Sequence, residues 1–302
     1  MKPQGYNKPL YILAFDHRAS FTKNMLGIVT EPDLEQTKKI IEFKNIIFSG
    51  FQHGVSLGVP KEEAAVLCDE QFGDAVLRGA KDLGFNFAQC CEKSGQKEFD
   101  FEYGEDFGAH VQEYGPTFVK ALVRYNPEDD KEMNQRQLAR LKVLSEYCHK
   151  HNTKFLIEPL VPALPEQLKK VDEDQKRYDL EIRPELMVRM VAQMQQAGVE
   201  PDVWKIEGLE QTEEYEKIIQ QARKDGRNNV SAVVLGRGAN LEQVEKWLQA
   251  ASMAEGVVGF AIGRSIFHEA LMQFKEGKMT KEETVQKIGE NYFNFYKIFN
   301  NQ

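Results

Sequence analysis

The chain has 302 residues, 41% hydrophobic and 28% charged, which is typical of a soluble globular protein. Its formal charge of −8 argues against general nucleic-acid binding, which needs a basic face. The sequence has no apolar run of the roughly 20 residues that a membrane span needs, and residues 1–18 lack the pattern of a signal peptide. The four cysteines have no C-x-x-C spacing, so we expect reduced thiols and a cytoplasmic protein.

Short apolar runs alternate with longer helical patterns along the chain. The predicted strands are 10–15, 64–68, 85–90, 118–125, 154–160, 202–207, 230–236 and 256–263. The predicted helices are 33–51, 72–83, 134–149, 184–197, 212–224, 240–254, a segment after 263, and 281–299. Strands of continuous apolar character that alternate with helices indicate a parallel sheet covered by helices.

Eight such units in this length favour a (β/α)₈ TIM barrel of the α/β class. The alternative is an open doubly wound sheet, which normally has a glycine-rich turn after its first strand. The segment that follows the first predicted strand here, Asp16-His17-Arg18, is not such a turn. Because the sequence has no convincing linker, we expect a single domain over residues 1–302.

Polar residues lie where the predicted strands end, which is where barrel enzymes place their chemistry. In strand order they are Asp16-His17-Arg18, Asp69, Glu92-Lys93, Arg124 with Lys120 inside its strand, Glu158, Lys205 and Glu207 carried by the sixth strand, Gly236-Arg237-Gly238 and Gly263-Arg264-Ser265. We therefore expect charged side chains from every strand to meet at one mouth of the barrel.

The last two strands each end in a Gly-Arg pair, in "LGRGAN" and "AIGRSIF". Glycine lets backbone N–H groups approach an anion, and arginine offers a fork that matches phosphate oxygens. Loops after strands seven and eight often hold phosphate in barrels. The alternative is two turns with surface arginines; we predict a phosphate site at Gly236, Arg237, Gly238, Gly263 and Arg264.

Lys120 and Lys205 both lie inside apolar runs. A lysine becomes nucleophilic when burial or a nearby cation lowers its pKa, and it then condenses with a ketone. The protonated imine accepts electrons when the adjacent C–C bond breaks. The alternative is an inward lysine paired with a carboxylate. The residues alone do not decide between these uses, or which lysine would react.

Two carboxylates could assist this chemistry. Glu158 is a candidate proton shuttle or ion-pair partner, and Asp16 could bind a substrate hydroxyl, orient a lysine or cap a loop. The histidines have no zinc-binding spacing such as H-E-x-x-H, so we expect no metal and no cofactor. The alternative is a magnesium-dependent lyase that uses Asp16, Asp69 and Glu92.

Several ordered segments together resemble a known family. They are "LYILAFDHRASFTKNMLGI", "VLCDEQFG", "CEKSG", "VKALVRYNPEDD", "FLIEPLVP", "DVWKIEGLE" and "GFAIGRSIF". Over about residues 9–297 the chain is similar to the aldolase-type domain fused to 5-dehydro-2-deoxygluconokinase, which acts in inositol catabolism. More distantly it resembles class I tagatose 1,6-bisphosphate and sulfofructose-phosphate aldolases.

The resemblance implies a barrel with a metal-independent Schiff-base mechanism. It implies that Lys205 forms the imine, with Lys120, Glu158 and Asp16 as its catalytic partners and Arg264 on phosphate. Two departures from the bisphosphate aldolases are Asp16-His17-Arg18 in place of Asp-Gln-Arg and Arg124-Tyr125 in place of two tyrosines. With Arg124 or His17 as its carboxylate partner, 2-deoxy-5-keto-gluconate 6-phosphate becomes the expected substrate.

We therefore expect an aldehyde-lyase that cleaves this keto sugar acid phosphate to dihydroxyacetone phosphate and malonate semialdehyde. The expected partner is a small sugar phosphate, with neither nucleic acid nor a membrane, and the sequence leaves open a homo-oligomer. The alternatives are an aldolase of the tagatose bisphosphate or sulfofructose-phosphate type, and a non-catalytic barrel that senses a sugar phosphate.

Overall fold

The computed structural model describes residues 5–301 and contains eight strands among them. They are β1 (Leu10–Ala14), β2 (Ala64–Cys68), β3 (Asn86–Cys90), β4 (Phe118–Arg124), β5 (Lys154–Leu160), β6 (Val203–Glu207), β7 (Ser231–Leu235) and β8 (Val257–Ile262). All eight predicted strands are present, each within one residue of its predicted bounds at both ends.

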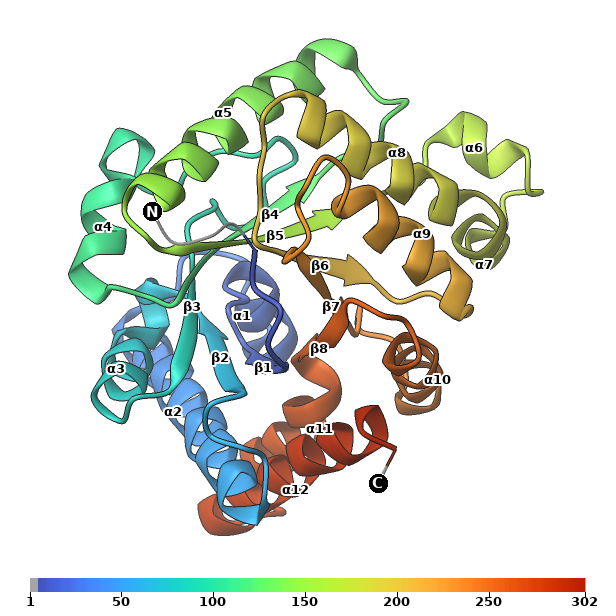
Figure 1. The fold of residues 1–302 in the computed structure, drawn as a ribbon. Coiled ribbons are helices and arrows are strands. Elements are labelled where there is room, and N and C mark those ends of the chain that lie inside the picture. The colour runs from blue at the N-terminus through green and yellow to red at the C-terminus, as the bar shows by residue number, and fades with distance from the viewer. Residues whose placement is uncertain (1–4, 302) are drawn as a thin grey trace.

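The strands pair in parallel and in chain order, and β8 pairs with β1 to close the barrel. Ile12 of β1 lies opposite Ala65 of β2 on one side and Ala261 of β8 on the other. Figure 1 shows this ring from one end, with helices arranged around its outside. The predicted (β/α)₈ barrel is confirmed, and the open doubly wound sheet is excluded because the ring has no free edge.

The longer helices cover the barrel. They are α2 (Leu34–Leu57), α3 (Glu70–Asp82), α5 (Lys131–Lys150), α8 (Arg183–Gln196), α9 (Thr212–Ala222), α10 (Leu241–Ser252), α11 (Arg264–Lys275) and α12 (Lys281–Phe299). Shorter elements that the sequence pattern did not predict are α1 (Ala19–Leu26), η1 (Gly104–Asp106), α4 (Phe107–Tyr114), α6 (Pro165–Lys169), α7 (Gln175–Arg177) and the π-helical η2 (Tyr178–Ile182). They lack enough turns to show a clear 3.6-residue period.

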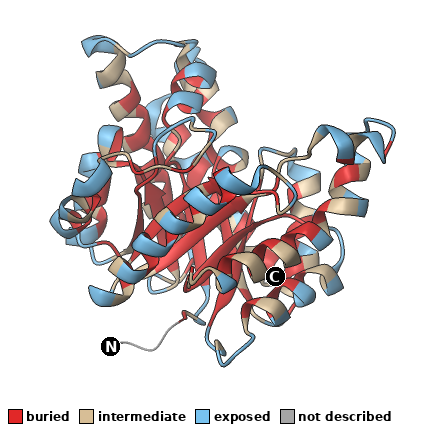
Figure 2. Ribbon diagram, turned by 90° about the horizontal axis from the view of Figure 1, so that it is seen from above, coloured by how far each residue is buried: buried red, intermediate tan, exposed pale blue. Residues whose placement is uncertain are grey.

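The core has an inner and an outer layer, separated by the strands. Along β6, Val203 belongs to the interior cluster, whereas Trp204 and Ile206 pack in the outer cluster beneath the helices. Side chains alternate between the two faces of a strand, so Lys205 points into the barrel. Figure 2 shows the result, with buried strands at the centre and exposed residues on the outer faces of the helices.

The C-terminal helix α12 is rich in aromatic residues and packs against the outside of the barrel. Tyr292 of α12 is fully buried and donates a hydrogen bond from its hydroxyl to the Tyr11 carbonyl at 2.7 Å. Its neighbour Phe295 is also buried against the core. Across the described part of the chain, no helix combines the length and apolar character needed to cross a membrane.

Candidate active site

A cavity of 360 Å³ opens at the carboxyl ends of the strands. Its walls include residues from β1, β3, β4, β5, β6, β7 and β8 or the loops that follow them. The expectation of charged groups from every strand was wrong for β2. Asp69, which follows β2, instead pairs with the buried Lys44 Nζ and caps α3 by accepting from the Phe72 N–H at 2.8 Å.

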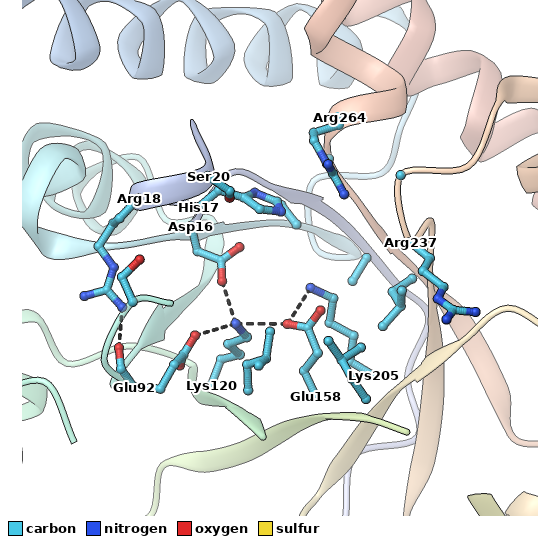
Figure 3. A pocket seen from close by; sticks show the side chains of 18 of the residues that line it. Asp16, His17, Arg18, Ser20, Glu92, Lys120, Glu158, Lys205, Arg237 and Arg264 are labelled. Atoms are coloured by element: carbon cyan, nitrogen blue, oxygen red, sulfur yellow. Dashed lines mark hydrogen bonds and ion pairs between the residues drawn. The ribbon is translucent and has the colours of Figure 1, made fainter. Parts of the chain in front are cut away.

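Lys120 of β4 lies at the centre of a carboxylate cluster (Figure 3). Its Nζ is 2.6 Å from Asp16 Oδ2, 2.6 Å from Glu92 Oε1 and 2.9 Å from Glu158 Oε2. The side chain is 1% exposed. Asp16 follows β1, whereas Lys120 and Glu158 lie in β4 and β5. Closure of the barrel brings the end of β1 to the same mouth as these later strands.

Lys205 of β6 lies on the other side of Glu158. Its Nζ is 3.0 Å from Glu158 Oε2, the same oxygen that contacts Lys120, and the side chain is 4% exposed. Lys205 has this one carboxylate partner among residues 5–301, whereas Lys120 has three. The structure therefore brings together the four residues predicted to be catalytic, Asp16, Lys120, Glu158 and Lys205.

The charges within this cluster shift the pKa values of its members. Burial favours the neutral amine, but Asp16, Glu158 and Glu92 raise the pKa of Lys120 well above its usual value. In turn, although burial opposes ionisation, Lys120 and Lys205 hold the pKa values of Asp16 and Glu158 below their usual range. Burial raises the pKa of Glu92. Lys120 is thus a lasting ammonium charge, which suits an electrostatic role better than a nucleophilic one.

Arg264 begins helix α11 at the opposite side of the mouth, and its guanidinium points into the cavity (Figure 3). In the described part of the chain it has no carboxylate within ion-pair distance. The first N–H groups of a helix lack partners within the helix and favour an anion. Gly236, Gly238 and Gly263 line the same wall. This arrangement can hold a phosphate group.

Steric constraints also explain why glycine occupies positions in this wall. A Cβ on Gly263 would lie 1.9 Å from the Ala14 carbonyl oxygen, so β8 can approach the end of β1 only through glycine. Gly238 has φ of 70°, in the left-handed region that favours glycine. Packing thus accounts for Gly263 without a ligand, and its predicted phosphate role stays a prediction.

Arg237 differs from what its motif predicts. It lines the cavity, but its guanidinium turns away from the two lysines (Figure 3). Its Nη1 is 2.7 Å from Asp179 Oδ2 and its Nε is 2.9 Å from Glu207 Oε1. Two carboxylates already compensate its charge, which favours Arg264 over Arg237 for direct contact with phosphate. The two Gly-Arg pairs, alike in sequence, therefore have different surroundings, and a phosphate contact by either arginine stays a prediction.

The two residues predicted to bind a substrate carboxylate, Arg124 and His17, differ in their surroundings. Arg124, at the end of β4, donates from Nη1 to the Gln96 carbonyl at 2.7 Å and has no ion-pair partner within residues 5–301. His17 has a buried Nδ1 that has no hydrogen-bond partner among the residues that the structure describes. Burial, reinforced by Lys205 and Arg264 against the opposing effect of Asp16, lowers the pKa of His17 to about 4. A neutral histidine brings no positive charge, which favours Arg124.

Sequence reasoning missed the part that Glu92 and Arg18 play. Glu92 follows β3 and completes the Lys120 cluster, while Arg18 donates to the Glu92 carbonyl oxygen and pairs with Glu102 at 2.7 Å. Both residues stood at predicted strand ends. The contact between them needs the fold, because 74 residues separate them in the chain.

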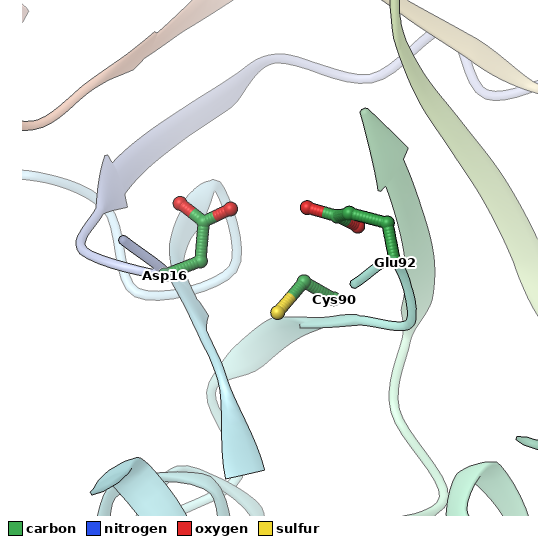
Figure 4. Close-up of side chains that lie close together, drawn as sticks. All are labelled: Asp16, Cys90 and Glu92. Atoms are coloured by element: carbon green, nitrogen blue, oxygen red, sulfur yellow. The ribbon is translucent and has the colours of Figure 1, made fainter. Parts of the chain in front are cut away.

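The magnesium alternative needs Asp16, Asp69 and Glu92 to meet, and they do not, because Asp69 is committed to Lys44. Asp16, Cys90 and Glu92 instead offer ligand atoms within 4.8 Å of one another (Figure 4). The Lys120 ammonium contacts both of these carboxylates at 2.6 Å. The charge that would attract a cation is therefore compensated by a side chain of the protein.

A family profile described as "Uncharacterized protein conserved in bacteria (DUF2090)" matches residues 2–302. The chain belongs to the DUF2090 family. No curated protein sequence matches this family member. Its resemblance to the 2-deoxy-5-keto-gluconate 6-phosphate aldolase domain therefore rests on the motifs alone.

Solved structures match this DUF2090 barrel in fold. Fructose-bisphosphate aldolase from Plasmodium falciparum, in a ternary complex with TRAP and a small-molecule inhibitor, has 11% identity and a TM-score of 0.67, over 97% of this chain and 90% of that chain. A Schiff-base-forming fructose-1,6-bisphosphate aldolase has 12% identity and a TM-score of 0.57, over 96% of this chain and 94% of that chain. At these identities the likeness shows the barrel fold, and function must come from the site.

Proposed function

We propose that this protein is a class I aldolase in which Lys205 forms a Schiff base with a phosphorylated ketose-like substrate. The observation that carries the proposal is the pair of buried lysines that share one oxygen of Glu158 in the barrel mouth. Among residues 5–301, three carboxylates hold Lys120 as a cation, while Lys205 has one carboxylate partner. Both solved relatives described above are named as fructose-bisphosphate aldolases, one of them as Schiff-base-forming, which agrees with this chemistry.

Lys205 and Glu158 carry out the covalent and proton-transfer steps of the proposed reaction. Glu158 takes a proton from the Lys205 side chain, and the neutral amine attacks the ketone carbon to form a carbinolamine while a proton of the amine passes to the carbonyl oxygen. Glu158 returns its proton to the carbinolamine hydroxyl, so that water leaves and the iminium forms. Glu158 then accepts the proton of the substrate hydroxyl as the C–C bond breaks. The bond electrons pass to the iminium and give an enamine, which is protonated and hydrolysed to the ketone product. Lys120 and Asp16 hold Glu158 and the substrate hydroxyls in place.

The distribution of charge indicates a substrate with an anionic group at each end. Arg264 follows β8 and Arg124 ends β4, so they belong to opposite strands of the eight-stranded ring. Neither has a carboxylate partner in the described part of the chain, unlike Arg18 and Arg237 in the same wall. A phosphate at Arg264 and a carboxylate at Arg124 would stretch a six-carbon chain across the cavity that Lys205 also lines.

The motif resemblance makes 2-deoxy-5-keto-gluconate 6-phosphate the proposed substrate. Lys205 would attack its C5 ketone, and cleavage between C3 and C4 would release malonate semialdehyde and leave dihydroxyacetone phosphate, as in inositol catabolism. Tagatose 1,6-bisphosphate and sulfofructose phosphate also have two anionic ends, so the arginines support them too. Product analysis with these three substrates decides among them.

The test is reductive trapping. Borohydride added with dihydroxyacetone phosphate should reduce the iminium and leave a stable adduct on Lys205, located by mass spectrometry of peptides. Activity should persist in excess chelator. An adduct on Lys120, or none at saturating ligand, contradicts the assignment.

The same experiment separates an enzyme from a sugar-phosphate sensor. A sensor needs Arg264 and the glycine turns but no reacting amine. In that case Lys205→Met would keep ligand binding and the wild-type protein would give neither adduct nor cleavage products. The proposed aldolase instead loses both adduct and turnover in Lys205→Met.

A further inference from the structure

Arg237 belongs to a network of charged side chains beside the cavity. The proposed reaction steps do not involve this network. Glu207 Oε1 is 2.9 Å from Arg237 Nε and 3.5 Å from Arg183 Nη1. Asp179 completes the network, with Oδ2 at 2.7 Å from Arg237 Nη1 and Oδ1 at 3.2 Å from Arg183 Nε. Two arginines and two carboxylates thus balance each other in charge, and Glu207 and Arg183 are each 2% exposed.

The network joins three parts of the barrel mouth. Glu207 ends β6, two residues after Lys205, and its Oε2 accepts from the Val161 N–H after β5 at 2.9 Å. Asp179 lies in η2, the π-helical segment of the insertion between β5 and α8. Such π-helical turns are rare and recur near functional sites. The strand that carries Lys205 is therefore tied through Glu207 to the turn after β7.

The turn that Arg237 belongs to has an unusual backbone. Arg237 and Gly238 have φ of 46° and 70°, and a non-glycine residue adopts the left-handed region only when its surroundings hold it there. The two carboxylates on its guanidinium supply that hold. Gly238 in turn lies against Arg264, since a Cβ on Gly238 would be 2.4 Å from Arg264 Nη2. The position of the turn therefore sets the space in which the Arg264 guanidinium lies.

We propose that Arg237 is a positioning residue: anchored by Glu207 and Asp179, it fixes the Gly236–Gly238 turn so that this turn and Arg264 bind the substrate phosphate at a set distance from Lys205. The role is indirect, because the Arg237 guanidinium turns away from the lysines. The inference rests on the proposed phosphate site. It assigns the insertion between β5 and α8 a task, which is to support the phosphate turn from outside.

The test compares Arg237→Ala, Arg237→Lys and Asp179→Asn with a matched control, Arg177→Ala. Arg177 lies in the same insertion and pairs with Asp172 and Glu181, away from the turn. Calorimetric titration with inorganic phosphate should show binding weakened about 10- to 100-fold in Arg237→Ala, because the turn loses the charge-assisted contacts to Glu207 and Asp179 that hold it in place. Arg237→Lys and Asp179→Asn should fall between Arg237→Ala and wild type, and Arg177→Ala should match wild type.

A second readout separates positioning from a general loss of structure. Borohydride trapping of Lys205 with dihydroxyacetone phosphate should need more ligand in Arg237→Ala, while trapping with dihydroxyacetone, which has no phosphate, should be unchanged. Equal affinity for phosphate in wild type, Arg237→Ala and Asp179→Asn overturns the inference. If Arg237→Ala does not fold, Asp179→Asn alone decides, because it leaves the Arg237–Glu207 contact in place.

The two proposals fail in different ways. Wild-type protein that binds phosphate but forms no adduct with either ketone contradicts the aldolase, whereas a loss of phosphate binding in Arg237→Ala still supports the positioning role. An adduct that forms equally well with dihydroxyacetone phosphate in wild type and both variants supports the aldolase and removes the role of Arg237.

Discussion

The two lysines of the barrel mouth lie on opposite sides of one carboxylate oxygen, yet their surroundings differ. On the β4 side, Lys120 contacts Asp16, Glu92 and Glu158 within 2.9 Å. On the β6 side, Lys205 contacts Glu158 alone of the carboxylates in residues 5–301. Three carboxylates keep an amine protonated and therefore unreactive. Lys120 therefore suits the role of a lasting cation, and Lys205, with a single carboxylate nearby among the described residues, is the lysine that we propose as the nucleophile.

Replacing each lysine in turn should separate their roles with the largest effects. Lys205→Met should abolish borohydride trapping and reduce turnover by on the order of 10⁵- to 10⁶-fold, as loss of a covalent nucleophile does. Lys120→Met should still form the adduct on Lys205, but turnover should fall by roughly 10²- to 10⁴-fold because Glu158 loses its orienting cation.

Peptide mass spectrometry and steady-state rates measure both effects. Lys246→Met, at an exposed position on α10 where the lysine pairs with Glu242, serves as the control and should behave as wild type. Equal adduct loss in both cavity variants would remove the distinction between the lysines.

Removal of Lys120 should also destabilise the protein. It leaves three buried carboxylates without their shared cation, which costs about 3–5 kcal/mol in the free energy of unfolding. Urea unfolding at neutral pH measures this loss.

The same variant should acquire affinity for a divalent cation, because Asp16, Cys90 and Glu92 present ligand atoms within 4.8 Å of one another. Manganese should raise the melting temperature of Lys120→Met but not that of wild type. The double variant Lys120→Met with Asp16→Asn should lose the response, and a response retained there would place the ion elsewhere.

Arg264 and Arg124 have no carboxylate partner in the described part of the chain, so both are available to anionic groups of a substrate. Arg264→Met should weaken inorganic phosphate binding and raise KM by about 10- to 100-fold. Arg124→Met should leave phosphate binding intact but raise KM by a similar factor for substrates with a second anionic group.

Arg189→Met, which removes a surface pair with Glu128, is the matched control. If Arg124→Met weakened free phosphate as much as Arg264→Met does, the two arginines would serve a single anion site.

The smallest expected effect is on the pH dependence of folding stability, and it depends on His17. Burial lowers the pKa of His17 in the folded protein to about 4, while an unfolded histidine titrates near about 6.5. Between these values the unfolded state binds more protons, so stability falls as the pH drops through this window, by at most about 1.4 kcal/mol per pH unit. Asp16 and Glu158, whose pKa values are lowered, add their own loss only at more acidic pH.

Urea unfolding between about pH 7 and pH 5 checks this slope, which rests on the histidine shift. His17→Gln should flatten it, and His151→Gln, at an exposed position, should not. An unchanged slope in His17→Gln would mean that His17 does not titrate as its burial implies.

The order of the elements, and with it the barrel, could be predicted from local sequence patterns. Eight apolar runs of strand length alternate with helical patterns, and both kinds of pattern can be recognised within short windows of the chain. From these bounds it follows that Asp16 and Glu158 lie at or near strand ends on one side of a parallel barrel, and that Lys120 and Lys205 lie inside the strands of the same ring. The short elements between β5 and α8 were missed because segments of three to five residues have no measurable period.

Only the tertiary structure decided which neighbours each charged residue has. "LGRGAN" and "AIGRSIF" are alike as sequences, but closure of the ring pairs Arg237 with Glu207 and Asp179 and leaves Arg264 facing the cavity. Asp69 pairs with Lys44, and Glu92 joins Lys120, for the same reason. An ion pair depends on distances of a few ångströms between residues far apart in the chain, and such distances are fixed by packing rather than by local pattern.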